Sequence, residues 1–151
     1  MKKILYKILE KRDLKSALNH LNSLERVLLS PQARFSIPFA FRGRGFFKSM
    51  QCMQNPDEIE QLYAFVCSLK PKRVLEIGTA KGGALYLWLQ AADPEATVVS
   101  VALPGGDFGG GYPACRIPFY QAFAKSSQTL HLLRADSHKL QTKQQVEELF
   151  Q

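Results

Sequence analysis

The segment "RVLEIGTAKGGALYLWLQ", residues 73–90, decides the fold class of this chain. It begins with an apolar run that contains one acid, Glu76, and such a run is typical of a buried strand. Gly78 follows the run directly, and an apolar helical pattern starts after Gly82 and Gly83. A strand, a glycine turn and a helix in this order indicate one unit of a parallel α/β sheet.

Strands and helices alternate in the same way along the rest of the chain. Strand-like runs cover residues 97–103 and 129–135, and helical patterns cover residues 115–126 and 142–150. This alternation predicts an α/β fold with a Rossmann-like, doubly wound parallel sheet of about three strands. We expect the strand order three-two-one, which leaves the first strand at an edge where a further strand could pair.

Residues 1–50 are interpreted as an N-terminal amphipathic helix and an irregular arm, and residues 51–151 as a partial Rossmann-like domain. The helix, residues 1–29, carries an apolar stripe at helical spacing and lysines on the opposite face. We expect it to be a packing or pairing helix that the ligand site does not need, with contact to an anionic membrane surface as the alternative. The arm, residues 32–50, interleaves five phenylalanines with four basic residues. We expect its rings to pack on the core rather than to bind single-stranded nucleic acid.

The charge of the chain is concentrated in its first third. Net charge is +7; residues 1–50 hold 11 Lys+Arg against 3 Asp+Glu, whereas residues 51–151 hold 9 against 10. Because the predicted sheet domain is nearly neutral, a nucleic-acid partner is not expected. No apolar run approaches the roughly 20 residues that span a bilayer, and a cytoplasmic protein is expected. Three scattered cysteines argue against a disulfide framework or a zinc site.

The turn after the first strand has the features of a ligand site. Ligands of parallel sheets bind at the carboxyl ends of the strands, where Gly78 lies. The free N–H groups of the following helix favour an anion, and Glu76 favours a cation. The amino-acid end of S-adenosylmethionine carries both charges. A P-loop and a dinucleotide fingerprint both fit poorly, because Lys81 precedes the glycines and position 80 is alanine. The alternative interpretation is a tight strand-to-helix turn that binds no ligand.

The segment "VLEIGTAKGGALYLW" resembles the first motif of class I S-adenosylmethionine-dependent methyltransferases. Within that family the chain is most similar to the cephalosporin-hydroxylase-like branch, over roughly residues 40–151. The similarity includes "MQNPDEIEQLY" before the motif, "LPGGDFGGGYP" after the second strand and "LHLLRADSH" at the third.

The resemblance implies a cofactor, a set of contacts and an activity. It implies that Glu76 lies near the methionine amino group, Asp136 near the adenine amino group, and Gln54 beside the cofactor. The residues expected to line the methionine and ribose are Gly78, Thr79, Ala80, Gly82 and Gly83. The implied function is methyl transfer to a small molecule or sugar hydroxyl. The alternative is an inactive, truncated cofactor-binding or interaction module. Assembly into a homo-oligomer is a further possibility.

Two departures from the family pattern affect this interpretation. Ala102 occupies the place of the acid that usually binds both ribose hydroxyls, and Asp107 in the glycine loop is a candidate substitute. We expect that loop to act as a lid. The chain also offers three strands where the family has about seven, so we expect a front portion of a longer protein or a truncated relative. The resemblance assigns no catalytic residue within this chain. It assigns no metal ligand either, because the family residues that would hold a divalent metal are absent from this chain. Cofactor binding without methyl transfer is expected.

Overall fold

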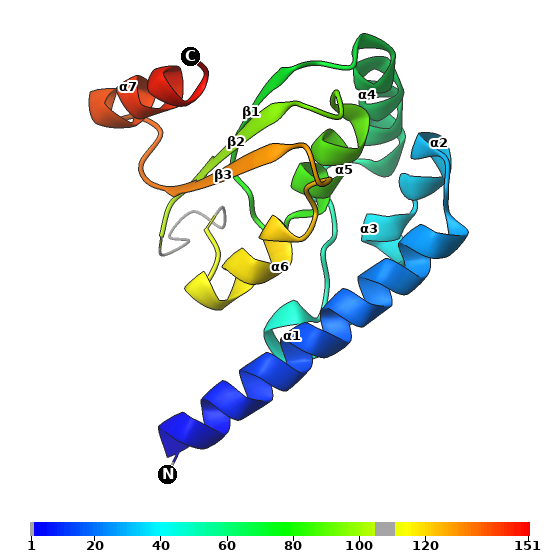
Figure 1. Cartoon of the computed structure of the whole chain (residues 1–151), viewed down its shortest axis with the longest axis vertical. Coiled ribbons are helices and arrows are strands. Elements are labelled where there is room, and N and C mark those ends of the chain that lie inside the picture. Colours follow the sequence, from blue (N-terminus) through cyan, green and yellow to red (C-terminus); the bar gives the residue numbers. More distant parts are fainter. Residues whose placement is uncertain (1, 105–110) are drawn as a thin grey trace.

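Figure 1 shows the computed structural model of the chain, which describes residues 2–104 and 111–151. Its centre is an all-parallel sheet of β1 (Arg73–Ile77), β2 (Thr97–Ala102) and β3 (Thr129–Arg134), in the order β1-β2-β3. The α/β class and the strand order predicted from the sequence are therefore confirmed, and β1 lies at an edge.

Helices precede, connect and follow the strands. Those before the sheet are α1 (Lys2–Val27), α2 (Pro31–Arg34), α3 (Ile37–Ala40), the 3₁₀ turn η1 (Gly45–Phe47) and α4 (Pro56–Leu69). Those after β1 are α5 (Gly83–Ala91), the 3₁₀ turn η2 (Ala114–Arg116), α6 (Ile117–Gln121) and α7 (Leu140–Leu149). Asn55 caps α4, because its side chain accepts a hydrogen bond from the backbone N–H of Asp57 at 3.0 Å.

The two faces of the sheet pack against different helices. In β2, the side chains of Val98 and Ala102 join the large core on the α5 side, whereas Val99 and Val101 pack with Val146 of α7. This alternation follows from the two-residue period of a strand. The sheet is thus covered on both faces, as Figure 1 shows for α5 and α7.

The N-terminal helix is part of the main core. Ala17 and Leu21 of α1 are fully or almost fully buried in the cluster that also contains Leu85 of α5. The hydroxyl of Tyr86 donates a hydrogen bond to Glu25 at 2.9 Å. Removing residues 1–29 would therefore expose one side of the core, whereas the expectation that the ligand site does not need this helix stays a prediction.

The aromatic arm packs its rings inward, as the sequence analysis expected. Phe41 and Phe47 are completely buried, and their ring centroids lie 5.3 and 5.7 Å from that of Phe119 in α6. Aromatic pairs at such separations stabilise a core beyond their buried area. The arm is less irregular than predicted, because α2, α3 and η1 form within it.

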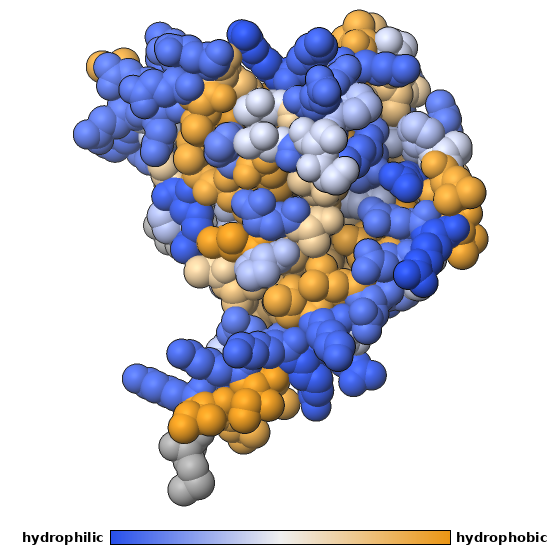
Figure 2. Space-filling model, viewed as in Figure 1, coloured by the Kyte–Doolittle hydropathy of each residue, from blue (hydrophilic) through white to orange (hydrophobic). Residues whose placement is uncertain are grey.

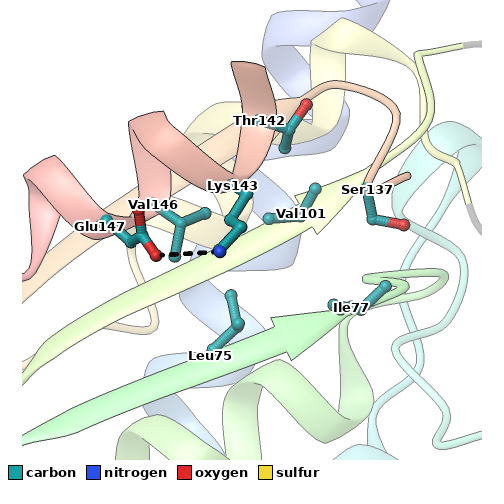
Figure 3. Close-up of a pocket in the computed structure, with 8 residues that line it drawn as sticks. All are labelled: Leu75, Ile77, Val101, Ser137, Thr142, Lys143, Val146 and Glu147. Atoms are coloured by element: carbon teal, nitrogen blue, oxygen red, sulfur yellow. Dashed lines mark ion pairs between the residues drawn. The ribbon is translucent and has the colours of Figure 1, made fainter. Parts of the chain in front are cut away.

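The edge strand β1 leaves apolar side chains uncovered. Leu75 and Ile77 are 48% and 66% exposed, although they lie on the same face as the α7-covered residues of β2. They border a groove of about 320 Å³ whose other wall is α7, as Figure 3 shows. An open strand edge with apolar neighbours is a site where another strand can pair.

Within the described residues, no helix combines the length and the apolar character that crossing a membrane requires.

Candidate functional site

Glu76 is the buried carboxylate at the centre of the candidate site. The register of the sheet places it opposite Ser100 of β2, and only 7% of its surface is exposed. The Ser100 hydroxyl donates to Oε2 of Glu76 at 2.5 Å and lies 2.6 Å from the Thr79 hydroxyl. The other oxygen, Oε1, is buried without a hydrogen-bond partner among the described residues. A buried carboxylate oxygen without a partner is costly, so it marks a place where a donor would bind favourably.

The electrostatics of Glu76 favour a cationic partner. Burial raises the pKa of Glu76 to about 7, whereas the Ser100 hydroxyl and, to a smaller extent, the nearby Trp88 side chain oppose that rise. A cation beside Oε1 would restore the ionised form, because an opposite charge compensates the loss of hydration.

Three residues of the turn, Gly78, Ala80 and Gly82, have a positive φ. Gly78 has a φ of +94°, and a Cβ built on it would have no heavy atom within 4 Å, so the space beside it is open. Ala80 has a φ of +45°, a conformation that costs a non-glycine residue roughly 1–2 kcal/mol. The hydroxyl of Tyr120 donates to the Ala80 carbonyl at 2.9 Å and helps to hold this strained turn.

Gly82 and Gly83 have structural partners that the sequence analysis did not identify. A Cβ on Gly82 would overlap the ring of Tyr120, and Gly82 also has a φ of +80°. A Cβ on Gly83 would overlap the backbone of Met50 and Cys52. The close packing at these two glycines is therefore against the protein itself, whereas Gly78 borders open space.

Arg116 ties the turn to the end of the arm. Its guanidinium donates to the carbonyl of Ser49 at 2.7 Å and to that of Lys81 at 3.2 Å, and it lies over the ring of Tyr120. Arg116 is 8% exposed. A buried guanidinium with these contacts fixes the turn relative to the segment before α4.

Two small hollows border the turn. The first hollow, of about 30 Å³, lies between the turn and the chain before α4. It brings together five predicted site residues: Gln54, Gly78, Thr79, Ala80 and Gly83. The second hollow, of about 120 Å³, lies at the carboxyl ends of all three strands and shares Gly78 with the first. Both are smaller than the roughly 300–1,000 Å³ of ordinary ligand pockets.

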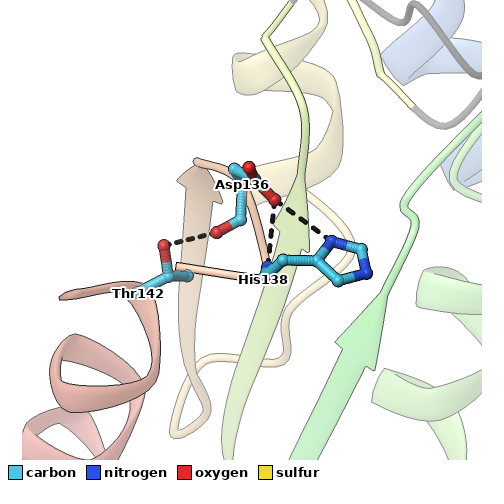
Figure 4. A network of polar contacts seen from close by, with 3 residues as sticks. All are labelled: Asp136, His138 and Thr142. Atoms are coloured by element: carbon cyan, nitrogen blue, oxygen red, sulfur yellow. Dashed lines mark hydrogen bonds and ion pairs between the residues drawn. The ribbon is translucent and has the colours of Figure 1, made fainter. Parts of the chain in front are cut away.

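Asp136 lies in the loop after β3, beside the second hollow but bonded within its own loop. Its neighbours Ala135 and Ser137 line that hollow. The Asp136 carboxylate accepts hydrogen bonds from the backbone N–H of His138 at 3.0 Å, and it lies 3.2 Å from the His138 ring, as Figure 4 shows. The backbone bond lowers the pKa of Asp136. Its carbonyl accepts from the Thr142 hydroxyl at 2.7 Å, which joins the loop to α7.

The end of β2 is filled by an arginine and a tyrosine. Ala102 is paired in register with Arg134, whose guanidinium donates to the carbonyls of Pro104 and Tyr112. The Tyr112 ring lies beneath this guanidinium, and its hydroxyl is buried without a partner among the described residues. Asp107 and most of the predicted lid lie outside the described residues.

The chain was compared with models of protein families, with curated proteins and with solved structures. None of the three comparisons found a match.

Proposed function

We propose that this chain is the S-adenosylmethionine-binding part of a methyltransferase that acts on a small molecule. The observation that carries the proposal is Oε1 of Glu76, a buried carboxylate oxygen that has no hydrogen-bond partner among the described residues and lies in β1 two residues before the open turn at Gly78. The ammonium of the ligand would donate to this oxygen, and its carboxylate would lie near the free N–H groups at the start of α5. The resemblance of residues 74–88 to the first methyltransferase motif supports the same ligand.

Binding at this place requires the site to open. The two hollows together are far smaller than a pocket for a ligand of this size. Displacing Tyr112 would break no hydrogen bond between its hydroxyl and the described residues, but it would separate the ring from Tyr120 and Arg134. Its pKa is raised mainly by burial and also by the nearby Glu76 charge.

A non-catalytic module with the same fold is the second candidate. Ala102 occupies the place of the family's ribose-binding acid, and Arg134, its partner in β3, donates to the carbonyls of Pro104 and Tyr112. A chain without that acid would keep the fold without the cofactor. The two candidates differ in one measurable property, which is whether the chain binds the demethylated cofactor.

Calorimetric titration with S-adenosylhomocysteine tests the proposal. The wild-type chain is expected to bind the ligand, and Glu76→Gln is expected to weaken binding roughly tenfold to a hundredfold, because a charge-assisted hydrogen bond is lost. Glu60→Gln makes the same change at an exposed position of α4 and should leave affinity unchanged. Equal affinity in wild type and Glu76→Gln would contradict the assignment of the pocket. Absence of binding to the wild-type chain would favour the non-catalytic module.

A further inference from the structure

The first turns of α1 carry an apolar patch that nothing in the described structure covers. On the side of the body, the ring of Tyr6 contacts Phe46, with centroids 5.6 Å apart. The helical period of 3.6 residues turns Ile4 and Ile8 away from that side, with Leu5 next to them. These three side chains are 67%, 58% and 59% exposed in that order. Figure 2 shows this patch on the projecting end of the helix, bordered by hydrophilic residues.

The three acids of α1 lie toward the body of the protein. The Glu25 carboxylate accepts a hydrogen bond from Tyr86, and the Asp13 side chain is only 16% exposed and lies beside Gly45 of η1. Glu10 is half-buried, and its charge raises the pKa of Cys115 in η2, although burial is the larger cause. The acids are thus removed from the outward face of the helix.

Several cations of α1 lie on the outward face and continue the line of the apolar patch. Lys11 and Lys15 follow Ile8 on the same side, and both are exposed. Arg12 is also exposed on this side, but its guanidinium donates to the Asp13 carboxylate at 3.2 Å. Arg26 lies farther along that side and is exposed as well. From residue 3 to residue 27, the outward face therefore combines branched apolar side chains at one end with cations along its length and holds no acid.

We propose that the outward face of α1 binds an anionic membrane surface, with Ile4, Leu5 and Ile8 inserted among the lipid chains. A helix with an apolar patch and a cationic face is the pattern of interfacial helices. The long stems of Lys11 and Lys15 allow their ammonium groups to remain at the headgroups while the apolar end lies deeper. Each such cation raises partition to an anionic surface roughly fivefold.

A second copy of the chain fits this face less well than a membrane. Pairing two outward faces would place the Lys11 and Lys15 of each copy opposite those of the other, with no acid on either outward face to compensate. Like charges at an interface oppose association. An anionic lipid surface supplies the missing negative charge and the apolar phase together.

Vesicle co-sedimentation with the whole chain tests the proposal. Vesicles of phosphatidylcholine with roughly one phosphatidylserine in four should bind the wild-type chain at low salt, and vesicles of phosphatidylcholine alone should bind it much less. High salt should reduce binding, because it screens exposed charges. Lys11→Gln with Lys15→Gln should weaken binding roughly twentyfold. Ile4→Gln with Ile8→Gln should weaken it at least about tenfold.

The matched control separates a local effect from net charge. Lys72→Gln with Lys139→Gln removes the same charge from exposed positions outside α1 and should leave binding nearly unchanged. Circular dichroism should show the same helix content in all variants, because every replaced side chain is exposed. The proposal is overturned if wild-type protein does not sediment with anionic vesicles at low salt, or if the control pair weakens binding as much as the α1 pair. It is also overturned if sedimentation velocity without lipid shows a dimer that Ile4→Gln with Ile8→Gln abolishes.

Discussion

Replacing Gly83 with alanine is expected to destabilise the protein by about 3 kcal/mol, although alanine is the better helix former. A Cβ at Gly83 would lie under 3.0 Å from the backbone of residues 50–52, which real Cβ atoms essentially never do. The obstructing atoms belong to main chain, so no side chain can rotate away and the segment before α4 must shift. Urea unfolding followed by circular dichroism would measure the change in the free energy of unfolding.

Gly78→Ala is the matched variant in the same turn. Its Cβ meets no atom within 4 Å, so its cost should come only from the φ of +94° and amount to about 1–2 kcal/mol. Gly83→Ala should therefore be the less stable of the two. A Gly83→Ala protein as stable as wild type would show that this contact does not position α5.

Replacing Glu76 with glutamine is expected to make the protein more stable than wild type at alkaline pH. Burial raises the pKa of Glu76 from 4.5 to about 7 in the folded protein. The folded state therefore holds the proton more tightly than the unfolded state between these values, and wild-type stability falls as pH rises through that window. The shift corresponds to about 3 kcal/mol between pH 4.5 and pH 8.

The difference between the two proteins isolates this one group. Glu76→Gln and wild type should have similar free energies of unfolding at about pH 3, well below both pKa values, where Glu76 is protonated in both states. The variant should then gain relative stability up to about pH 8. Glu60→Gln, an exposed change of the same kind, should parallel wild type at every pH. A constant difference between Glu76→Gln and wild type would mean that the pKa of Glu76 is not raised.

The strands were predictable because each is a short apolar run next to turn residues. The run at 73–77 was expected as a strand and forms β1 with the same bounds, and the run at 97–103 forms β2, which ends at Ala102. The apolar character of β2 reflects packing on both faces, whereas Leu75 and Ile77 of the edge strand β1 are exposed although their run is also apolar. The helix expected at 115–126 is shorter, because the chain turns after Gln121 and the Lys125 N–H bonds to the Gln128 side chain.

The contacts that shape the site were less predictable, since they join residues distant in sequence. Gly82 and Gly83 can be noticed in the sequence as glycines. The sequence does not show that the Tyr120 ring and the backbone of residues 50–52 lie so close to them that a Cβ would not fit. No local pattern connects Arg116 with the turn that it holds. Ser100 offered a signal, because a serine inside a buried apolar strand needs a hydrogen-bond partner. That partner is Glu76, which is paired in register with Ser100 in the neighbouring strand.

The central claim is that Glu76 receives the ammonium group of the bound ligand, and proton release on binding tests it most directly. Free Glu76 is mostly protonated at about pH 6, because its pKa is about 7, and a cation beside Oε1 should ionise it. Titration of S-adenosylhomocysteine in two buffers with different heats of ionisation should therefore reveal release of nearly one proton per ligand at about pH 6, little release at about pH 8, and none from Glu76→Gln. Binding heat at about pH 6 that is independent of the buffer, or no binding at all, would contradict the claim.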